Sequence, residues 1–180
     1  MRIWTTQTKQ LWEALKRDGF VTCCDSLISR AFPEQYGWMV EQMDRRIGPS
    51  PSPGVHFPLW GWHQVGSYKK ELHPNPGACW GECKDWVFLT LEMPDDKVLL
   101  SEYTLWEAGP LSGLYLPQGM KDEDSDDPAL RRASWEIIFN IDAQTRFSPR
   151  KRRNKLIQAC FWEIKMDWVE RAVPFHHAGF

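Results

Sequence analysis

The sequence lacks any apolar run that approaches the roughly 20 residues needed to span a bilayer. Its first residues, Met1 to Gln7, lack the long apolar stretch of a signal peptide. Its 5 cysteines, an odd number that includes the adjacent pair Cys23 and Cys24, make a poor disulfide framework. These absences predict a cytoplasmic protein with no membrane partner.

The sequence also lacks an excess of charge of one sign. Its formal net charge is −2, so no global positive field concentrates nucleic acid around it. Tryptophan is abundant instead: 11 Trp stand against 4 Tyr, which excludes a disordered chain. A length of 180 residues with 42% hydrophobic residues suffices for one core. We therefore expect one globular domain over residues 1–172 and a C-terminal tail over residues 173–180.

Hydrophobic periodicity predicts an α+β fold. Threonine (Thr6 or Thr8) and Gly19 are suited to cap the first helix, and Asp127 followed by Pro128 is suited to begin the last one. Helices come early in the chain, and strands dominate its middle and end, so we expect a mixed or antiparallel sheet with flanking helices. The expected helices cover 8–19, 33–48 and 128–140, a helical turn covers 103–108, and the expected strands cover 2–6, 59–65, 86–92, 98–100 and 156–169.

Glu163 is a candidate catalytic carboxylate within the last expected strand. Apolar residues alternate there with Glu163, Lys165 and Asp167, which is the period-two pattern of a strand with one buried face. The carboxylate either belongs to a solvated polar face or lines a cleft. Trp60 and Trp62, which share one face of another expected strand, could form the wall of that cleft.

Several common catalytic motifs are missing. The sequence has no G-x-S-x-G elbow, no P-loop and no G-x-G-x-x-G, which excludes most hydrolases, kinases and dinucleotide-fold dehydrogenases. No family signature surrounds Cys23 or Cys24. His73, Cys79 and Cys83 form one loose group without a second ligand pair, so a loop with free thiols is favoured and no metal site is expected.

A basic cluster covers residues 146–155. Its six cations could contact phosphates with an affinity that weakens as salt rises, and Arg150, Arg152 and Arg153 are the candidate nucleic-acid contacts. Five acids precede the cluster in residues 122–127 and could pair with it. A solvated charged loop is therefore the default interpretation, and contact with RNA or DNA is the alternative.

A set of short motifs resembles an uncharacterised bacterial family, the domain of unknown function 3841. They extend from residue 3 to about residue 169, and the family carries no established activity. The matching pieces are Ile3-Trp4-Thr5-Thr6-Gln7, Tyr36-Gly37-Trp38-Met39, Arg46-Ile47-Gly48-Pro49, Pro58-Leu59-Trp60-Gly61-Trp62, Pro94-Asp95-Asp96, Leu99-Leu100-Ser101 and Phe161-Trp162-Glu163.

The opening of the chain, Trp4-Thr5-Thr6-Gln7 followed by a helix that ends at Gly19, also resembles the first strand and helix of ADP-ribosyltransferases. In the DNA-targeting toxin branch of that superfamily, this part of the fold binds NAD, and a glutamate on a late strand assists transfer. That branch carries a histidine near the first-strand threonine, where this chain has Trp4 and Gln7.

This second resemblance implies an ADP-ribosyltransferase-like fold and specific roles. Glu163 would be the catalytic carboxylate and NAD the cofactor. A nucleic acid held by residues 146–155, or a protein, would be the acceptor. The residues expected to bind NAD are two polar contacts, Thr6 and Gln7, and three pocket walls, Tyr36, Trp60 and Trp62.

Three functions stay open at the level of sequence. The first is an NAD-dependent ADP-ribosyltransferase-like enzyme, which requires Glu163, Thr6 and either Trp60 or Trp62 around one concave pocket. The second is a non-catalytic module that contacts nucleic acid through residues 146–155, or a protein partner through exposed tryptophans. The third is a protein that binds another small ligand.

Overall fold

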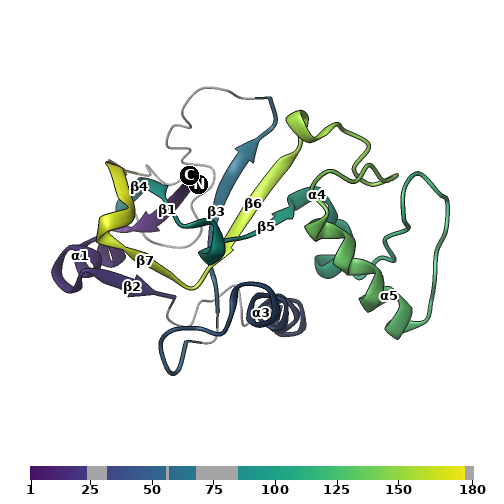
Figure 1. Cartoon of the computed structure of the whole chain (residues 1–180), viewed down its shortest axis with the longest axis horizontal. Helices are drawn as coiled ribbons and strands as arrows, with labels where there is room; N and C mark the ends of the chain where they lie inside the picture. The colour runs from purple at the N-terminus through teal and green to yellow at the C-terminus, as the bar shows by residue number, and fades with distance from the viewer. Residues whose placement is uncertain (24–31, 56, 68–84, 177–180) are drawn as a thin grey trace.

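A six-stranded antiparallel sheet forms the centre of the fold, in a computed structural model that describes residues 1–23, 32–55, 57–67 and 85–176 (Figure 1). Two short strands, β2 (Phe20–Thr22) and β7 (Glu163–Lys165), pair in a separate sheet. The predicted α+β fold is confirmed, and its sheet is antiparallel. Across the large sheet the order is β5 (Leu99–Glu102), β6 (Leu156–Phe161), β3 (Leu59–Val65), β1 (Arg2–Thr8), β4 (Asp85–Glu92) and β8 (Val169–His176).

The helix starts predicted at Thr8 and Asp127 and the helix end predicted at Gly19 are confirmed, whereas the helix expected over 128–140 ends at Ser134 and continues as a 3-10 helix. The Thr8 hydroxyl accepts a hydrogen bond from the backbone N–H of Leu11, and Gly19 ends the same helix with a φ of 80°. The Asp127 carboxylate accepts from the backbone N–H groups of Ala129 and Leu130. The helices are α1 (Lys9–Asp18), α3 (Pro33–Ile47), α4 (Tyr103–Trp106), the π-helical η3 (Glu107–Leu111), α5 (Pro128–Ser134) and the 3-10 helices η2 (Asp95–Lys97), η4 (Trp135–Phe139), η5 (Arg152–Asn154) and η6 (Met166–Trp168).

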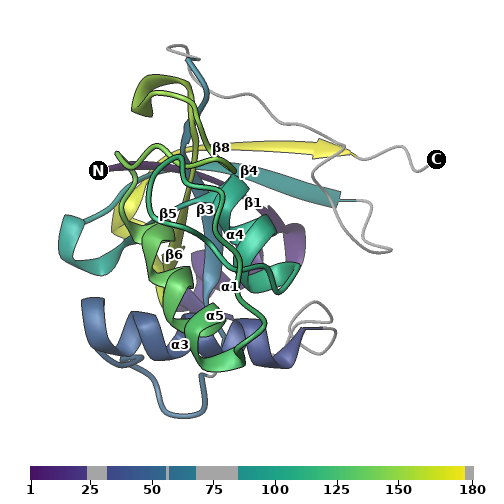
Figure 2. The ribbon, with the colours of Figure 1, turned by 90° about the vertical axis from the view of Figure 1, so that its right-hand side faces the viewer.

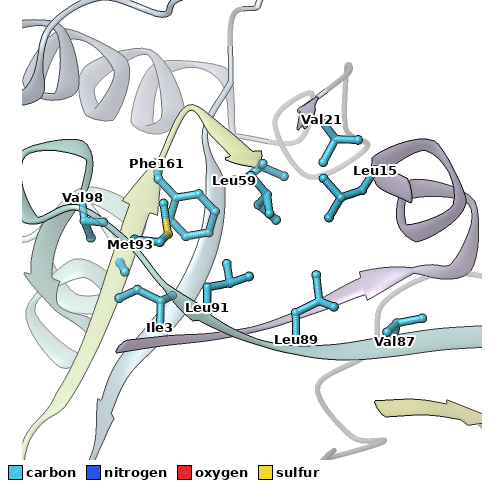
Figure 3. Packing of buried hydrophobic residues seen from close by; sticks show 12 residues of the cluster. Ile3, Leu15, Val21, Leu59, Val87, Leu89, Leu91, Met93, Val98 and Phe161 are labelled. Carbon is cyan, nitrogen blue, oxygen red and sulfur yellow. The ribbon is translucent and has the colours of Figure 1, made fainter. Parts of the chain in front are cut away.

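One face of the sheet packs against helix α1 and the small β2–β7 sheet (Figure 3). Ile3 and Leu89 contribute from strands β1 and β4, and Phe161 contributes from β6. Leu15 of α1 and Val21 of β2 close the cluster from outside the sheet. Burial of this apolar surface is the main stabilising term for the β1–α1–β2 unit.

The opposite face is covered over β5 and β6 by helices α3, α4 and η4 (Figure 2). Trp38, Met39 and Met43 of α3 share this second core with Leu105 of α4 and Ile138 of η4. Strand β6 is therefore buried on both faces, since its alternate residues enter the two cores.

The prediction of one strand over residues 156–169 is wrong. Strand β6 ends at Phe161, the chain bends at Trp162, and Glu163 belongs to β7 of the small sheet. Residues 162 and 164 would share one face of a continuous strand, yet Trp162 enters the second core and Ile164 the first. The Trp162 indole N–H also donates to the carbonyl of Gly48, 2.8 Å away. Burial of both side chains in different cores thus requires the bend.

Strand β8 returns to the far edge of the large sheet beside β4 (Figure 2). It ends at His176, four residues beyond the domain boundary that the sequence predicted at 172. Residues 173–176, expected in a tail, are paired with β4. Residues 177–180 lie outside the described residues.

The large sheet is only weakly joined between strands β1 and β3. Seven residue pairs join β1 to β4, whereas a single pair, Trp4 with Trp62, joins β1 to β3. The strands approach most closely at Gly61, where an added Cβ would lie 2.7 Å from Ile3 Cγ2 and 2.8 Å from the Trp4 carbonyl oxygen. Next to this crossing, the Thr5 hydroxyl donates to the Trp60 carbonyl at 2.7 Å. A side-chain hydrogen bond thus joins β1 to β3 at a point where backbone hydrogen bonds would otherwise join them.

We expect the substitution Gly61→Ala to lower the free energy of unfolding by about 1–3 kcal/mol. The new methyl group would overlap the Trp4 carbonyl oxygen, which is backbone and cannot move without separating β1 from β3. Urea unfolding followed by tryptophan fluorescence measures the effect.

The matched control is Gly37→Ala on helix α3, where an added Cβ meets nothing within 4 Å. Alanine should raise stability there by about 0.5–1 kcal/mol, because it loses less backbone entropy than glycine in a helix. Equal effects of the two substitutions would contradict the close crossing at Gly61.

Candidate functional site

A row of paired residues runs across all six strands at the level of the β1–β3 crossing. The cross-strand pairs link Ser101 to Gln158, Gln158 to Trp62, Trp62 to Trp4, Trp4 to Thr90 and Thr90 to Arg171. Residues directly opposite each other in a sheet point to the same face, so these side chains form one line. Two tryptophans stand at its centre, where the sheet divides.

Aromatic rings surround this centre on the same face. Trp60, two residues before Trp62, lies with its ring centroid 5.7 Å from that of Tyr36 and 5.3 Å from that of Trp106. The Trp62 ring meets Tyr103 edge-on at 5.2 Å. The sequence prediction that Trp60 and Trp62 share a face is confirmed by their common contacts with helix α4. We call Trp4, Tyr36, Trp60, Trp62 and Tyr103 the aromatic row.

Every member of the aromatic row is half-buried, although it stands over the middle of the sheet. A closed core would bury such rings completely. The rings of the row instead retain some accessible surface. Within the described part of the chain, the buried indole N–H groups of Trp4 and Trp60 have no hydrogen-bond partner. An unsatisfied buried donor costs about 1–3 kcal/mol.

The tyrosines of the row are hard to ionise. Burial raises the pKa of Tyr36 to about 12, and the neighbouring Cys160 and Cys23 thiol groups act in the same direction. Burial likewise raises the pKa of Tyr103 to about 12, assisted by Glu107. Both hydroxyls are therefore neutral at physiological pH and can only donate or accept hydrogen bonds.

Thr6 and Gln7 lie at the end of β1 that diverges from β3. Thr6 is two residues from Trp4 and so faces the same side as the aromatic row. Gln7 faces the opposite side, where its side-chain amide donates to the Thr5 hydroxyl at 2.7 Å. Of the five residues predicted to bind NAD, the fold thus places Thr6, Tyr36, Trp60 and Trp62 on one face and leaves Gln7 on the other.

Glu163 lies outside the aromatic row, on strand β7. Its side chain is 14% exposed, and one of its oxygens is 3.2 Å from the Lys165 ammonium group. It lines two neighbouring hollows. The smaller, of about 60 Å³, is lined by Ile47, Pro49, Pro51, Lys97, Trp162, Glu163 and Trp168, and the larger and more open one, of about 460 Å³, by Asp18, Gly19, Phe20, Pro51, Ser52, Glu163, Lys165 and Asp167.

The larger hollow is mostly open to solvent, so its volume of about 460 Å³ is that of a surface depression and not of an enclosed pocket. Neither hollow is lined by Thr6, Trp60 or Trp62. The Glu163 groove, as we call the two hollows together, is therefore separate from the aromatic row, and neither hollow is the one pocket that the enzyme hypothesis requires around Glu163, Thr6 and either Trp60 or Trp62. Cys160 pairs with Trp60 and stands three residues before Glu163, with the bend at Trp162 between them.

Three of the six cations in the basic cluster are paired or buried, and the other three are exposed. Arg146 pairs with Asp122, as the acidic stretch suggested, and Arg152 lies 3.6 Å from Asp142. Lys155 is only 1% exposed and donates to the Ala143 carbonyl. The other three cations, Arg150, Lys151 and Arg153, are exposed, and no acidic side chain of the described residues pairs with them.

Metal and membrane features add little to the site. Among the described residues, no three His, Cys, Asp or Glu side chains gather to hold a metal ion. The predicted loop group His73, Cys79 and Cys83 lies outside the described residues, as do Cys24 and His56. None of the helices in the described ranges combines the length and apolar character that crossing a bilayer requires.

The sequence did not predict two parts of the site. Tyr103 was expected only in a helical turn, and its contact with Trp62 depends on β5 pairing with β6. The buried pair in which the Gln158 amide donates to Ser101 Oγ at 3.0 Å was missed because both residues look like ordinary strand positions. Ser101 carried a signal only as the last residue of the Leu99-Leu100-Ser101 motif.

The Tyr36 pKa generates a prediction about alkaline unfolding. The folded pKa of about 12 exceeds the ordinary value of 10.0, so this group's stabilising contribution is complete below pH 10 and is lost as pH rises from 10 to 12. At pH 11 the wild type should lose about 1 kcal/mol more of its unfolding free energy, relative to pH 9, than Tyr36→Phe. Urea unfolding at both pH values measures this, and identical losses would contradict burial of the hydroxyl.

Comparison with known proteins places the chain in a family. A family model described as Domain of unknown function (DUF3841) matches residues 2–132. No curated protein and no solved structure matches the chain, and none of the comparisons matches an ADP-ribosyltransferase. Because the family model covers most of the sequence, the chain belongs to the DUF3841 family.

Proposed function

We propose that this protein is an NAD-dependent ADP-ribosyltransferase-like enzyme of the bacterial cytoplasm, with Glu163 as its catalytic carboxylate. The observation that carries the proposal is the position of Glu163, a largely buried carboxylate between two adjoining hollows. Cys160 is a buried free thiol, which supports a reducing compartment.

The chemistry suits a fixed carboxylate. Transfer breaks the bond between the ribose C1′ and the nicotinamide nitrogen, and nicotinamide leaves with the electron pair. The ribose then develops oxocarbenium character, as in glycoside cleavage. The Glu163 carboxylate would stabilise that positive charge and orient the ribose hydroxyls. An acceptor nucleophile forms the new bond to C1′ and loses its proton.

The aromatic row supports the NAD part of the proposal. Trp60 and Tyr36 offer half-buried ring surface against which a nicotinamide or adenine ring would pack. Thr6 adds a hydroxyl on the same face. Among the described residues, the row and Glu163 line no common hollow, so the proposal requires the dinucleotide to extend from one to the other.

The direct test combines NAD binding with turnover. Isothermal titration should detect NAD binding to the wild type, and chromatography should detect released nicotinamide, with or without added RNA or DNA. Glu163→Gln should keep the NAD affinity and reduce nicotinamide release by about 100-fold or more, because it removes the charge that stabilises the transition state.

The control is Glu170→Gln on strand β8, an exposed carboxylate that pairs with Arg2. Its loss of one negative charge should leave turnover at the wild-type level. Absence of NAD binding, or equal turnover in wild type and Glu163→Gln, would eliminate the proposed enzyme. Binding without turnover would favour a non-catalytic ligand-binding protein instead.

A further inference from the structure

Hydrogen bonds at both ends hold the loop over residues 149–154, which carries the exposed cations. The Gln144 amide donates to the Pro149 carbonyl at 2.7 Å, just before Arg150. At the other end the Gln64 amide donates to the carbonyls of Arg152, at 2.6 Å, and Lys155, at 3.2 Å. We call residues 149–154 the basic loop.

Buried polar residues hold the basic loop on both sides. Thr145 and Ser148 are buried and exchange backbone hydrogen bonds of 3.1 Å, which closes the turn that leads into the loop. Lys155 follows the loop, and its buried ammonium group donates to the Ala143 carbonyl. Gly66 donates its backbone N–H to the Lys155 carbonyl at 2.8 Å. Little backbone entropy is therefore left to lose when the loop binds a partner.

The charge that this support presents is positive. Arg150, Lys151 and Arg153 are exposed and have no acidic partner among the described residues. Asp142 offsets only Arg152, at 3.6 Å. These three exposed cations thus form a local positive group, within the described part of the chain, on a protein whose net charge is −2.

Aromatic surface lies beside the basic loop. Trp62 of strand β3 pairs with Gln158 of β6, which stands three residues, or about 10 Å, after Lys155 at the end of the basic loop. Trp62 and Tyr103 are both half-buried and meet edge-on at 5.2 Å. Cations that follow a phosphate backbone, with aromatic rings on which bases stack, are the two elements of single-stranded nucleic-acid binding.

We propose that the basic loop and the Trp62–Tyr103 pair form a binding surface for single-stranded nucleic acid. Arg150, Lys151 and Arg153 contact successive phosphates, and Trp62 stacks on a base. The surface shares Trp62 and Tyr103 with the aromatic row, but none of its residues lines the Glu163 groove, so it does not require the proposed catalysis. RNA and DNA share the phosphodiester chemistry that it recognises.

Fluorescence anisotropy with labelled dT12 and rU12 tests the proposal. Three phosphate contacts on a single strand predict a slope of about −2 for the logarithm of affinity against the logarithm of salt concentration. The triple substitution Arg150→Gln, Lys151→Gln and Arg153→Gln should weaken binding at least tenfold and bring the slope close to zero. Binding of either oligonucleotide with this pattern supports the surface.

The control removes the same charge elsewhere, through Lys9→Gln, Lys16→Gln and Lys121→Gln, three exposed lysines that each lie beside an acid. This variant should bind like the wild type. Trp62→Leu should weaken binding at least fivefold without changing the salt slope, with circular dichroism used to confirm that it folds. The Glu163→Gln variant should bind oligonucleotides normally, which separates this surface from the proposed catalysis.

Three results would overturn the proposal. The first is no binding of either oligonucleotide by the folded wild type. The second is an equal loss of affinity in the triple variant and its charge-matched control. The third is tighter binding of a 12-base-pair duplex than of the single strands, because stacked bases in a duplex are closed to Trp62.

Discussion

The close approach of β1 and β3 at Gly61 is the constraint on which the rest of the structure depends. Only a residue without a Cβ lets the Trp4 carbonyl and the Ile3 side chain come so near to the neighbouring strand. One residue pair and one threonine hydrogen bond then join the two halves of the sheet. Because the strands diverge from this crossing, the rings of Trp60 and Trp62 are supported by α3 and α4 instead of by a continuous ladder.

Around this crossing, the candidate functional residues are divided among separate regions of the molecule. The aromatic row stands over the division of the sheet, whereas Glu163 is carried to the small β2–β7 sheet by the bend at Trp162. The basic loop lies at the opposite end of β6 from that bend, where Gln64 and Lys155 hold it. Strand β6, buried on both faces, is the rigid element that fixes the separation of these regions.

Local rules predicted most elements because their signals are local. The Thr8 and Asp127 caps, the Gly19 end and the alternation in residues 59–65 each depend on a few neighbouring residues, and each is confirmed. The prediction of one strand over residues 156–169 was wrong for the converse reason. Period-two alternation cannot distinguish a strand with one buried face from a chain that passes between two cores, and only the packing of Trp162 and Ile164 decides this.

The sequence by itself determined the α+β class, the family, and the residue types available for chemistry: indole rings, one late glutamate and a cluster of cations. Only the tertiary structure decided how they are grouped. It gathered Trp4 with Trp60 and Trp62, moved Glu163 to another sheet, and paired or buried three of the six cations. The physical reason is that grouping depends on strand register and core packing between distant segments, which no local pattern encodes.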